Sequence, residues 1–465
     1  MTDVLVFNEH HSLKSVSSRV FIFNNQSTIN HLMKKVLLMA FFMSSMALQA
    51  QKTYLQCGQM IDMAKGKTYA QKTIVVNGQK IEAILDGFVV GAATDQTINL
   101  REQVVMPGFI DLHVHIEHES NPKTYMNRFT ENEADVAFGS TIYAKRTLMA
   151  GFTSVRDLGG SGVNLALRDA IARGIVVGPR IFTAGKAIGT TGGHADPSNG
   201  RSFDLMGDPG PREGVVNSAA DARKAVRQRY KDGADVIKIT ATGGVLSVAK
   251  NGQNAQFTPE ELAAVVSTAK DYHMLTAAHA HGDEGMRRAV EAGIKTIEHG
   301  TLMEAPTMEL MIKHDTYLVP TISAGKAAAA NAAIPGYFPA VIAKKALEIG
   351  PMSQVTFAKA YKKGVKIAFG TDAGVSPHGD NAKEFRFMHE AGMPVMEALQ
   401  SATVTNAMLL GYGEELGQLK SGFTADIIAV NTHPENQIES LENVVFVMKE
   451  GQVFKQENKE VLRDY

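Results

Sequence analysis

Short apolar runs alternate with longer stretches of helical character between residues 104 and 405. This alternation is typical of repeated βαβ units, which build a parallel sheet. The apolar runs expected to be strands are 109–115, 154–157, 180–184, 236–240, 275–281, 296–299, 317–320 and 367–372. Eight such strands with their helices match a (β/α)8 barrel, which takes ~250 residues. A helix is predicted to begin after Thr258, because Pro259 follows it and Glu261 completes a capping box.

Both flanks of this segment have a different pattern, in which short β-like runs are separated by turns. In the first flank, alternating apolar residues end at Asn77-Gly78, a dipeptide typical of hairpins. In the second, β-like runs occur at 425–430 and 444–448. We therefore predict an α/β protein in which a (β/α)8 TIM barrel carries one small β-module formed from the N- and C-terminal segments. The predicted boundaries are 51–103 and 406–465 for the β-module and 104–405 for the barrel.

The residues before this region have the layout of a targeting segment. Residues 33–50 begin with a lysine pair, continue as an apolar run and end in a small residue, as a signal peptide does. The apolar run is shorter than the ~20 residues that a membrane-spanning helix needs. We expect 1–32 to be a start-site extension, Met33 to be the natural start, and the mature chain to be exported to a bacterial periplasm or secreted, without a membrane span. An N-terminal anchor or a buried helix is the alternative.

Composition and charge narrow the range of partners. The net charge is −1, which gives no reason to expect a nucleic acid or an anionic membrane as partner. The single cysteine, Cys57, excludes an internal disulfide and a Cys-X-X-Cys zinc knuckle. A small molecule is therefore the expected partner.

Residues able to bind metal recur where the predicted strands end. A parallel barrel gathers its active-site residues at the C-terminal ends of its strands. His113 and His115, two apart on the first strand, project to the same side and can bind one ion. The other candidates lie on strands four, five, six and eight: Lys238, His279, His299 and Asp372. Imidazole and carboxylate donors suit Zn²⁺ or a similar divalent ion.

Lys238 is an unusual companion for cations, because an ammonium group has no lone pair to donate. Burial lowers the pKa of a lysine, and the neutral amine can react with CO2 to give a carbamate. A carbamate can bridge two ions and would make the site binuclear. Structural alternatives exist: Lys238 as a strand-end cation, His299 as a core histidine and Asp372 as a helix cap. The order of the candidates along the strands favours the metal site.

Two further histidines are candidates for substrate binding. His194 lies in a glycine-rich loop after strand three, where it either contacts a substrate carbonyl or carboxylate or belongs to a simple turn. His281 shares a strand face with His279, so it lines the pocket or orients a ligand. Arg156 and Asp157, after strand two, are predicted to be a structural pair.

The sequence resembles the amidohydrolase superfamily, in particular its imidazolonepropionase-related branch, which includes Xaa-Pro and Xaa-Arg dipeptidases. The resemblance is carried by Met106-Pro-Gly-Phe-Ile-Asp-Leu-His-Val-His115, Gly151-Phe-Thr-Ser-Val-Arg-Asp157, Gly233-Ala-Asp-Val-Ile-Lys238, His279-Ala-His-Gly282, Ile297-Glu-His-Gly300, Gly370-Thr-Asp-Ala373 and Leu416-Gly-Gln-Leu-Lys-Ser-Gly-Phe-Thr-Ala-Asp426. Imidazolonepropionase itself is less similar, because its site holds one metal and lacks the bridging lysine.

The resemblance implies a distorted (β/α)8 TIM barrel with a small β-sandwich formed from the N- and C-terminal segments. It also implies a site with two divalent metal ions, of which zinc is the expected identity. It places His113 and His115 on the more buried ion, and His279 and His299 on the more exposed one. Lys238, carboxylated on its amine, would bridge the two ions. Asp372 would bind the buried ion and act as the catalytic proton shuttle.

The function implied is hydrolysis of amide or peptide carbon–nitrogen bonds by a metal-bridged hydroxide, in a dipeptidase or N-acyl amino acid hydrolase. The alternatives left open are a hydrolase of a cyclic amide, a lactone or a xenobiotic amide, and a non-catalytic binding protein. The complete ligand set disfavours the last. Because members of the family often assemble, a homo-oligomer is also an open expectation.

Overall fold

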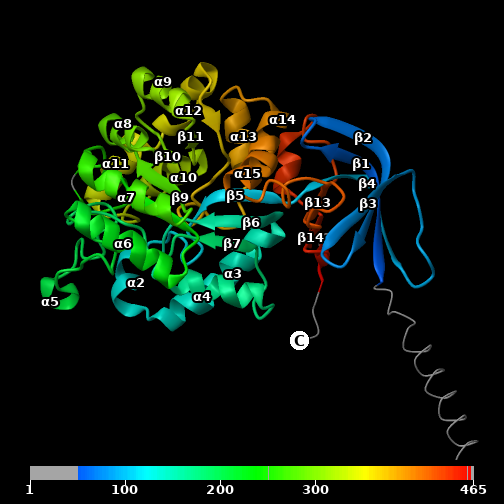
Figure 1. The fold of residues 1–465 in the computed structure, drawn as a ribbon, viewed down its shortest axis with the longest axis horizontal. Helices are drawn as coiled ribbons and strands as arrows, with labels where there is room; N and C mark the ends of the chain where they lie inside the picture. Colours follow the sequence, from blue (N-terminus) through cyan, green and yellow to red (C-terminus); the bar gives the residue numbers. More distant parts are fainter. Residues whose placement is uncertain (1–50, 250, 458, 462–465) are drawn as a thin grey trace, which may run out of the picture. The chain divides into compact units, whose positions relative to one another are not determined.

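Two parallel sheets ringed by helices form the larger part of the chain (Figure 1). The computed structural model describes residues 51–249, 251–457 and 459–461, so the predicted extension and signal peptide lie outside the described residues. One sheet has the order β5 (Phe109–Val114), β6 (Phe152–Asp157) and β7 (Arg180–Thr183). The other has the order β12 (Lys366–Ile367), β11 (Tyr317–Val319), β10 (Thr296–His299), β9 (Leu275–Ala280) and β8 (Val236–Thr240).

These strands correspond to the eight expected from the sequence, but they do not form one continuous hydrogen-bonded ring. The two sheets approach each other through isolated parallel bridges, Ile188 with Ile239 and Val114 with Ala373. Among the described residues, the arrangement is therefore barrel-like without being a closed eight-stranded sheet. The distortion expected from the sequence lies at these two junctions.

Helices follow the strands and cover the sheets (Figure 1). Those after the first three strands are α2 (Thr124–Thr130), α3 (Glu133–Met149), α4 (Val163–Ala172), α5 (Phe203–Met206) and α6 (Ala219–Asp232). The next are α7 (Pro259–Asp271), α8 (Asp283–Ala292), α9 (Ala305–Lys313), α10 (Ile322–Ala332), α11 (Ala340–Ile349) and α12 (Met352–Lys363). The last are α13 (Lys383–Glu390), α14 (Val395–Gln400), the π-helix η1 (Ser401–Thr405), α15 (Asn406–Leu409) and the 3-10 helix η2 (Ile438–Glu442). None of these described helices combines the length and apolar character needed to cross a lipid bilayer.

The predicted capping box is present at the start of α7. The Thr258 side chain accepts a hydrogen bond from the amide of Glu261, and the Glu261 carboxylate accepts one from the amide of Thr258. A cap of this kind contributes about 1 kcal/mol to helix stability.

Strands from both ends of the chain join in a third sheet. It has the order β16 (Lys459–Glu460), β15 (Gln452–Gln456), β14 (Phe446–Lys449), β13 (Ile427–Val430), β4 (Gln96–Pro107), β1 (Lys52–Asp62), β2 (Lys67–Asn77) and β3 (Lys80–Asp86). β1 and β4 are parallel, whereas their other neighbours are antiparallel. The predicted sandwich is thus one continuous mixed sheet, with a core shared by residues such as Leu55 and Phe446.

The last predicted barrel strand is shorter than expected. β12 ends at Ile367, so Asp372 lies in the following loop rather than within a strand. Backbone bonds still attach this loop to β5, because Leu112 donates to Phe369 and Asp372 donates to His113. Asp372 has a positive φ of 57°, which a regular strand cannot accommodate.

Candidate metal centre

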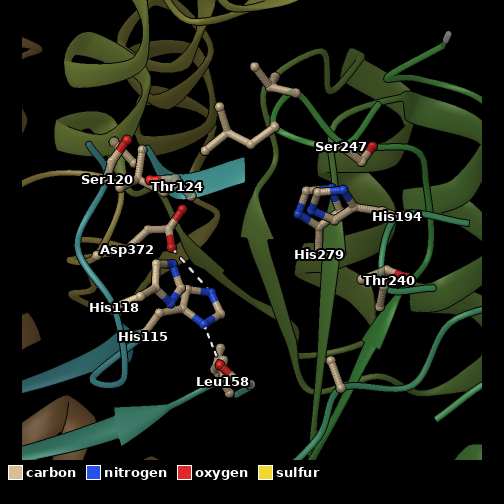
Figure 2. Close-up of a pocket in the computed structure, with 18 of the residues that line it drawn as sticks. His115, His118, Ser120, Thr124, Leu158, His194, Thr240, Ser247, His279 and Asp372 are labelled. Carbon is tan, nitrogen blue, oxygen red and sulfur yellow. Dashed lines mark hydrogen bonds and ion pairs between the residues drawn. The ribbon is translucent and has the colours of Figure 1, made fainter. Parts of the chain in front are cut away.

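All six candidate ligands line one cavity of about 620 Å³ at the C-terminal ends of the parallel strands. The two candidate substrate-binding histidines, His194 and His281, line the same cavity. Figure 2 shows His115 and Asp372 on one side of this pocket and His194 and His279 on the other. We call His113, His115 and Asp372 the acid side, and His194, His279 and His281 the loop side. Lys238 and His299 complete the set.

The acid side brings three side-chain atoms into close approach. Oδ1 of Asp372 lies 3.5 Å from Nε2 of His113 and 3.4 Å from Nε2 of His115. His113, His299 and Asp372 each offer a ligand atom, and these atoms lie within 4.8 Å of one another. His113 and His115 therefore project to the same side, as the strand period predicts, and both approach the same carboxylate oxygen.

Both imidazoles of the acid side are oriented through their other ring nitrogen. Nδ1 of His115 donates to the carbonyl oxygen of Gly159 over 2.7 Å, and Nδ1 of His113 donates to Oε2 of Glu298 over 2.9 Å. Each Nε2 consequently carries a lone pair, and both lone pairs face the carboxylate oxygen of Asp372. That oxygen is buried and has no hydrogen-bond partner.

The two imidazole nitrogens thus lie 3.4 to 3.5 Å from the carboxylate oxygen with their electron pairs directed towards it, and a cation among the three atoms would offset their repulsion. This arrangement fits a divalent metal ion, since imidazole nitrogen and carboxylate oxygen are its usual ligands. The desolvation of the buried carboxyl raises the pKa of Asp372, and the Lys238 ammonium opposes that shift. A bound cation would restore the ionised carboxylate.

Glu298 is a part of the site that the sequence analysis did not single out. It precedes His299 on β10, and its carboxylate also accepts hydrogen bonds from Nη2 of Arg156 at 2.8 Å and from the Thr296 hydroxyl at 2.5 Å. Arg156 and Asp157 are both fully buried, as expected of structural residues, but among the described residues they form no ion pair with each other: Arg156 pairs with Glu298. In the sequence, only the position of Glu298 directly before His299 could have suggested that it belongs to the site.

Lys238 lies beside the acid side of the cavity. Its Nζ is 3.5 Å from Nε2 of His113, and its side chain is buried. Burial lowers the pKa of the amine, while the nearby carboxylates of Glu298 and Asp372 oppose this shift. A larger neutral fraction is the condition under which a lysine amine reacts with CO2.

His299 occupies a strained backbone position beside the acid side. It has a positive φ of 71°, and Thr321, whose hydroxyl lies 2.6 Å from Nδ1 of His299, has a positive φ of 48°. Such conformations cost about 1–3 kcal/mol each in a residue other than glycine and persist where the surroundings hold them. Here Glu384 accepts hydrogen bonds from the amides of Ile322 and Ser323, which follow Thr321.

The loop side is arranged by ring contacts and by the loop after β8. The rings of His194 and His279 are stacked, with centroids 4.3 Å apart, and His279 meets His299 edge-on at 4.7 Å. Nε2 of His279 donates a hydrogen bond to the carbonyl oxygen of Gly243 over 3.1 Å. Nδ1 then carries the lone pair of the ring and is the atom that can bind a metal ion. A Cβ on Gly244 would lie 2.1 Å from Nδ1 of His194, so this close approach requires glycine.

His281 faces the cavity and is held by two threonines. Its Nδ1 lies 2.9 Å from the Thr301 hydroxyl, and its amide donates to the hydroxyl of Thr242. Burial lowers the pKa of His281 to about 4 and that of His194 to about 3, so both are neutral near pH 7. Nδ1 of His194 is buried without a hydrogen-bond partner.

A buried lysine fixes the loop after β8. Nζ of Lys345, on α11, donates to the carbonyl oxygens of Gly244, Ser247 and Ala249 at 2.7 to 2.8 Å. The hydroxyl of Tyr125 donates to the carbonyl of Leu246 in the same loop. The loop that contacts His194 and His279 is thereby attached to two separate helices.

Asp111 lies behind the ligands rather than in the cavity. Its carboxylate accepts hydrogen bonds from the His113 amide, from the amide and hydroxyl of Thr371, and from Asn381. This network connects β5 to the loop of Asp372. Asp111 therefore positions the backbone of two candidate ligands.

His118 lines the cavity, and the sequence analysis did not single it out. Its ring lies beside that of His115, with centroids 5.5 Å apart, and it lines the pocket (Figure 2). A third histidine three residues after the His-X-His pair was the available signal.

Known proteins share this architecture. The amidohydrolase family matches residues 104–454. Ochratoxinase from Aspergillus niger is 34% identical over 376 residues, which cover 76% of each chain. Among solved structures, a Xaa-Pro dipeptidase with methionine bound in its active site is 50% identical, has a TM-score of 0.85 and covers 87% of this chain and 100% of that chain. A prolidase complexed with N-methylphosphonate-L-proline is 32% identical, with a TM-score of 0.80 and coverage of 87% and 100%.

Proposed function

Because the chain belongs to the amidohydrolase family and is a hydrolase of carbon–nitrogen bonds, we propose that it is a metal-dependent dipeptidase or N-acyl amino acid hydrolase. The observation that carries this proposal is the convergence of two imidazole lone pairs on the unpartnered Oδ1 of Asp372. The similarity to a Xaa-Pro dipeptidase and a prolidase supports the dipeptide substrate class.

Two divalent ions, with zinc as the proposed identity, would be held by the six candidate ligands that line the cavity. The residues are His113, His115, Lys238, His279, His299 and Asp372. Bound there, the ions would supply Lewis-acid polarisation of the amide carbonyl and a lowered pKa for an attacking water. We propose that Lys238 holds the pair together as an N-carboxylated amine, which its burial supports.

The proton steps fall to Asp372. Asp372 lines the cavity, and its carboxylate can accept a proton from the attacking water. The same carboxyl group then delivers the proton to the departing amine. His194 and His281, neutral in this setting, would contact the substrate from the loop side.

A second candidate function is hydrolysis of a xenobiotic amide. The specific observation in its favour is the 34% identity to ochratoxinase over 76% of the chain. The two candidates share the same ligands and the same proton steps, so they differ only in the residues that contact the rest of the substrate.

The test is a substrate panel on metal-replete protein that starts near Gln51, with the ion content measured in parallel. The panel contains Xaa-Pro and Xaa-Arg dipeptides, N-acyl amino acids, lactams, lactones and ochratoxin. Hydrolysis of dipeptides or N-acyl amino acids that is lost on chelation supports the first candidate. Full activity after complete removal of metal would overturn the metal-dependent mechanism, and a preference for ochratoxin would favour the second candidate.

Export is a separate proposal, supported by the signal-like sequence of residues 33–50, which lie outside the described residues. Expression of the full chain followed by cell fractionation tests it. We expect a processed protein with an N-terminus near Gln51 outside the cytoplasm, and an unprocessed cytoplasmic protein would contradict the proposal.

A further inference from the structure

Two arginines line the catalytic cavity without an acidic partner. Arg128 lies on α2, which follows the first barrel strand, and Arg201 lies in the long loop after β7. Among the described residues, neither guanidinium has a carboxylate oxygen within 4.0 Å. Partial burial lowers the pKa of Arg201, and the nearby Arg128 guanidinium lowers it further. Two like charges that lie close together in a cavity repel each other, so other contacts must hold them there.

Aromatic rings of α2 hold the two guanidiniums. Cζ of Arg128 lies 5.1 Å from the ring centroid of Tyr125, and Cζ of Arg201 lies 5.3 Å from that of Phe129. Tyr125 and Phe129 are four residues apart, so they lie on one face of the helix. A stacked guanidinium is held in place while its N–H donors stay available in the ring plane.

The donors of Arg201 are largely unused by the protein. Its Nε is buried without a hydrogen-bond partner, and Nη1 donates only to the sulfur of Met206, a weak acceptor. A buried N–H that lacks a strong acceptor costs free energy, which a bound anion would recover. A guanidinium fork matches the two oxygens of a carboxylate.

Among the described residues, no acid that lines the same cavity forms an ion pair with these arginines, and two of these acids are engaged within their own loops. Asp196 accepts hydrogen bonds from Gly192 and Ser198 in its own loop. Glu213 accepts a hydrogen bond from the amide of Gly210, and this bond and the nearby charge of Lys186 lower the pKa of Glu213. Both carboxylates are thus satisfied elsewhere.

We propose that Arg128 and Arg201 form a subsite that binds a carboxylate of the substrate, away from the bond that is cleaved. This inference rests on the proposed function and specifies its substrate class: dipeptides or N-acyl amino acids that carry a free carboxylate. The carboxylate can be the C-terminal one or one on the side chain, and both have the same chemistry. The arms of the experiment separate the two sources.

The experiment compares three matched substrates: N-acetyl-leucine, N-acetyl-leucinamide and the α-amide of N-acetyl-glutamate. The variants are Arg128→Gln, Arg201→Gln and the double variant, with Arg223→Gln on the exposed part of α6 as the control for charge. We expect each cavity variant to raise KM for N-acetyl-leucine about tenfold, the effect of losing one charged hydrogen bond. KM for N-acetyl-leucinamide and the control variant should change little.

The substrate arms identify the source of the carboxylate. A KM effect confined to N-acetyl-leucine assigns the C-terminal carboxylate, whereas one confined to the glutamate α-amide assigns the side chain. Equal losses on all three substrates, or an equal effect of Arg223→Gln, would overturn the subsite. Arg128→Lys and Arg201→Lys keep the charge without the planar fork and should lie between wild type and the Gln variants.

Calorimetry with L-leucine and L-leucinamide on the metal-replete protein separates this inference from the proposed function. Tighter binding of L-leucine that is lost in the double variant supports the subsite even if no amide in the panel is hydrolysed. Hydrolysis of the panel with no preference for L-leucine would leave the proposed function standing and overturn the subsite.

Discussion

The acid side and the loop side of the cavity are held by different kinds of contact. On the acid side, His113 and His115 are oriented by a buried carboxylate and a backbone carbonyl within the barrel wall. On the loop side, His194 and His279 are stacked on each other and rest against the loop after β8. That loop in turn depends on Lys345.

The difference separates what must be rigid from what can vary. Residues on strands, or bonded to a strand through the backbone as Asp372 is to His113, are positioned by the sheet, which suits groups that bind ions and transfer protons. Residues that lie in a loop change position with the loop, which suits contacts to different substrates. Mutations on the acid side should therefore affect turnover and metal, whereas mutations of His194 or of the loop after β8 should affect substrate binding.

The largest effect is expected for Asp372→Asn on the acid side. The variant should retain much of its metal and lose about 10²–10⁴-fold in kcat, because it removes the group that transfers the proton. Steady-state kinetics with ion analysis of the same preparation measures both. Glu213→Gln, which removes another cavity carboxylate, is the matched control. A kcat near that of wild type in Asp372→Asn would exclude the proton-shuttle role.

Lys238→Ala tests the connection between the two sides. We expect the metal content to fall to about one ion or fewer, since a carbamate bridge holds two ions together. Activity should fall with it and recover in part when short carboxylates are added. Lys186→Ala, another cavity lysine, is the control, and ¹³C NMR after labelling with ¹³C-bicarbonate detects the carbamate directly. Full activity of Lys238→Ala without rescue would disprove the bridge.

Glu298→Gln weakens the orientation of His113 without removing a ligand. The expected loss in metal affinity or activity is about 10–100-fold. Thr321→Val, which removes the hydroxyl that contacts His299, gives the matched comparison and should cost less because a neutral partner is lost. Metal titration of variants shown by circular dichroism to be folded measures the effect. Equal affinities in wild type and Glu298→Gln would contradict the orienting role.

Lys345→Met probes the loop side. It leaves three carbonyl oxygens without their donor, so the loop should loosen and KM should rise about threefold to tenfold while kcat and metal content change less. Lys345→Arg keeps the charge and should recover part of the loss. A fall in kcat and metal content with an unchanged KM would break the distinction between the two sides.

The smallest effect concerns the pH dependence of stability behind His299. Burial raises the pKa of Glu384 to about 7, against about 4.3 in an unfolded chain. Between these values the folded state keeps a proton that the unfolded state releases, so this contribution to stability is complete at low pH and is lost as pH rises towards 7. Glu384→Gln cannot titrate and should lose less stability between pH 5 and pH 7.5. Urea midpoints across this range, compared with wild type, test the sign, and parallel curves would refute it.

The sequence predicted the strands better than their ends. Val236–Thr240 and Thr296–His299 match the expected ranges, because apolar runs bounded by polar residues mark a buried parallel strand. Asp372 was placed in a strand and lies in a loop with positive φ. Local propensity does not report such a conformation, because it is maintained by hydrogen bonds that the neighbouring Thr371 donates to the distant Asp111.

The types of the candidate ligands and their order along the chain were determined by the sequence alone, since strand periodicity and barrel topology place such residues together. Only the tertiary structure decided that Asp372 lies in a loop, that Glu298, 185 residues from His113, orients that histidine, and that Arg128 of α2 lies near Arg201 of the loop after β7. Contacts of this kind arise from the packing of segments that are distant in sequence, and no local pattern of hydrophobic and polar residues encodes them.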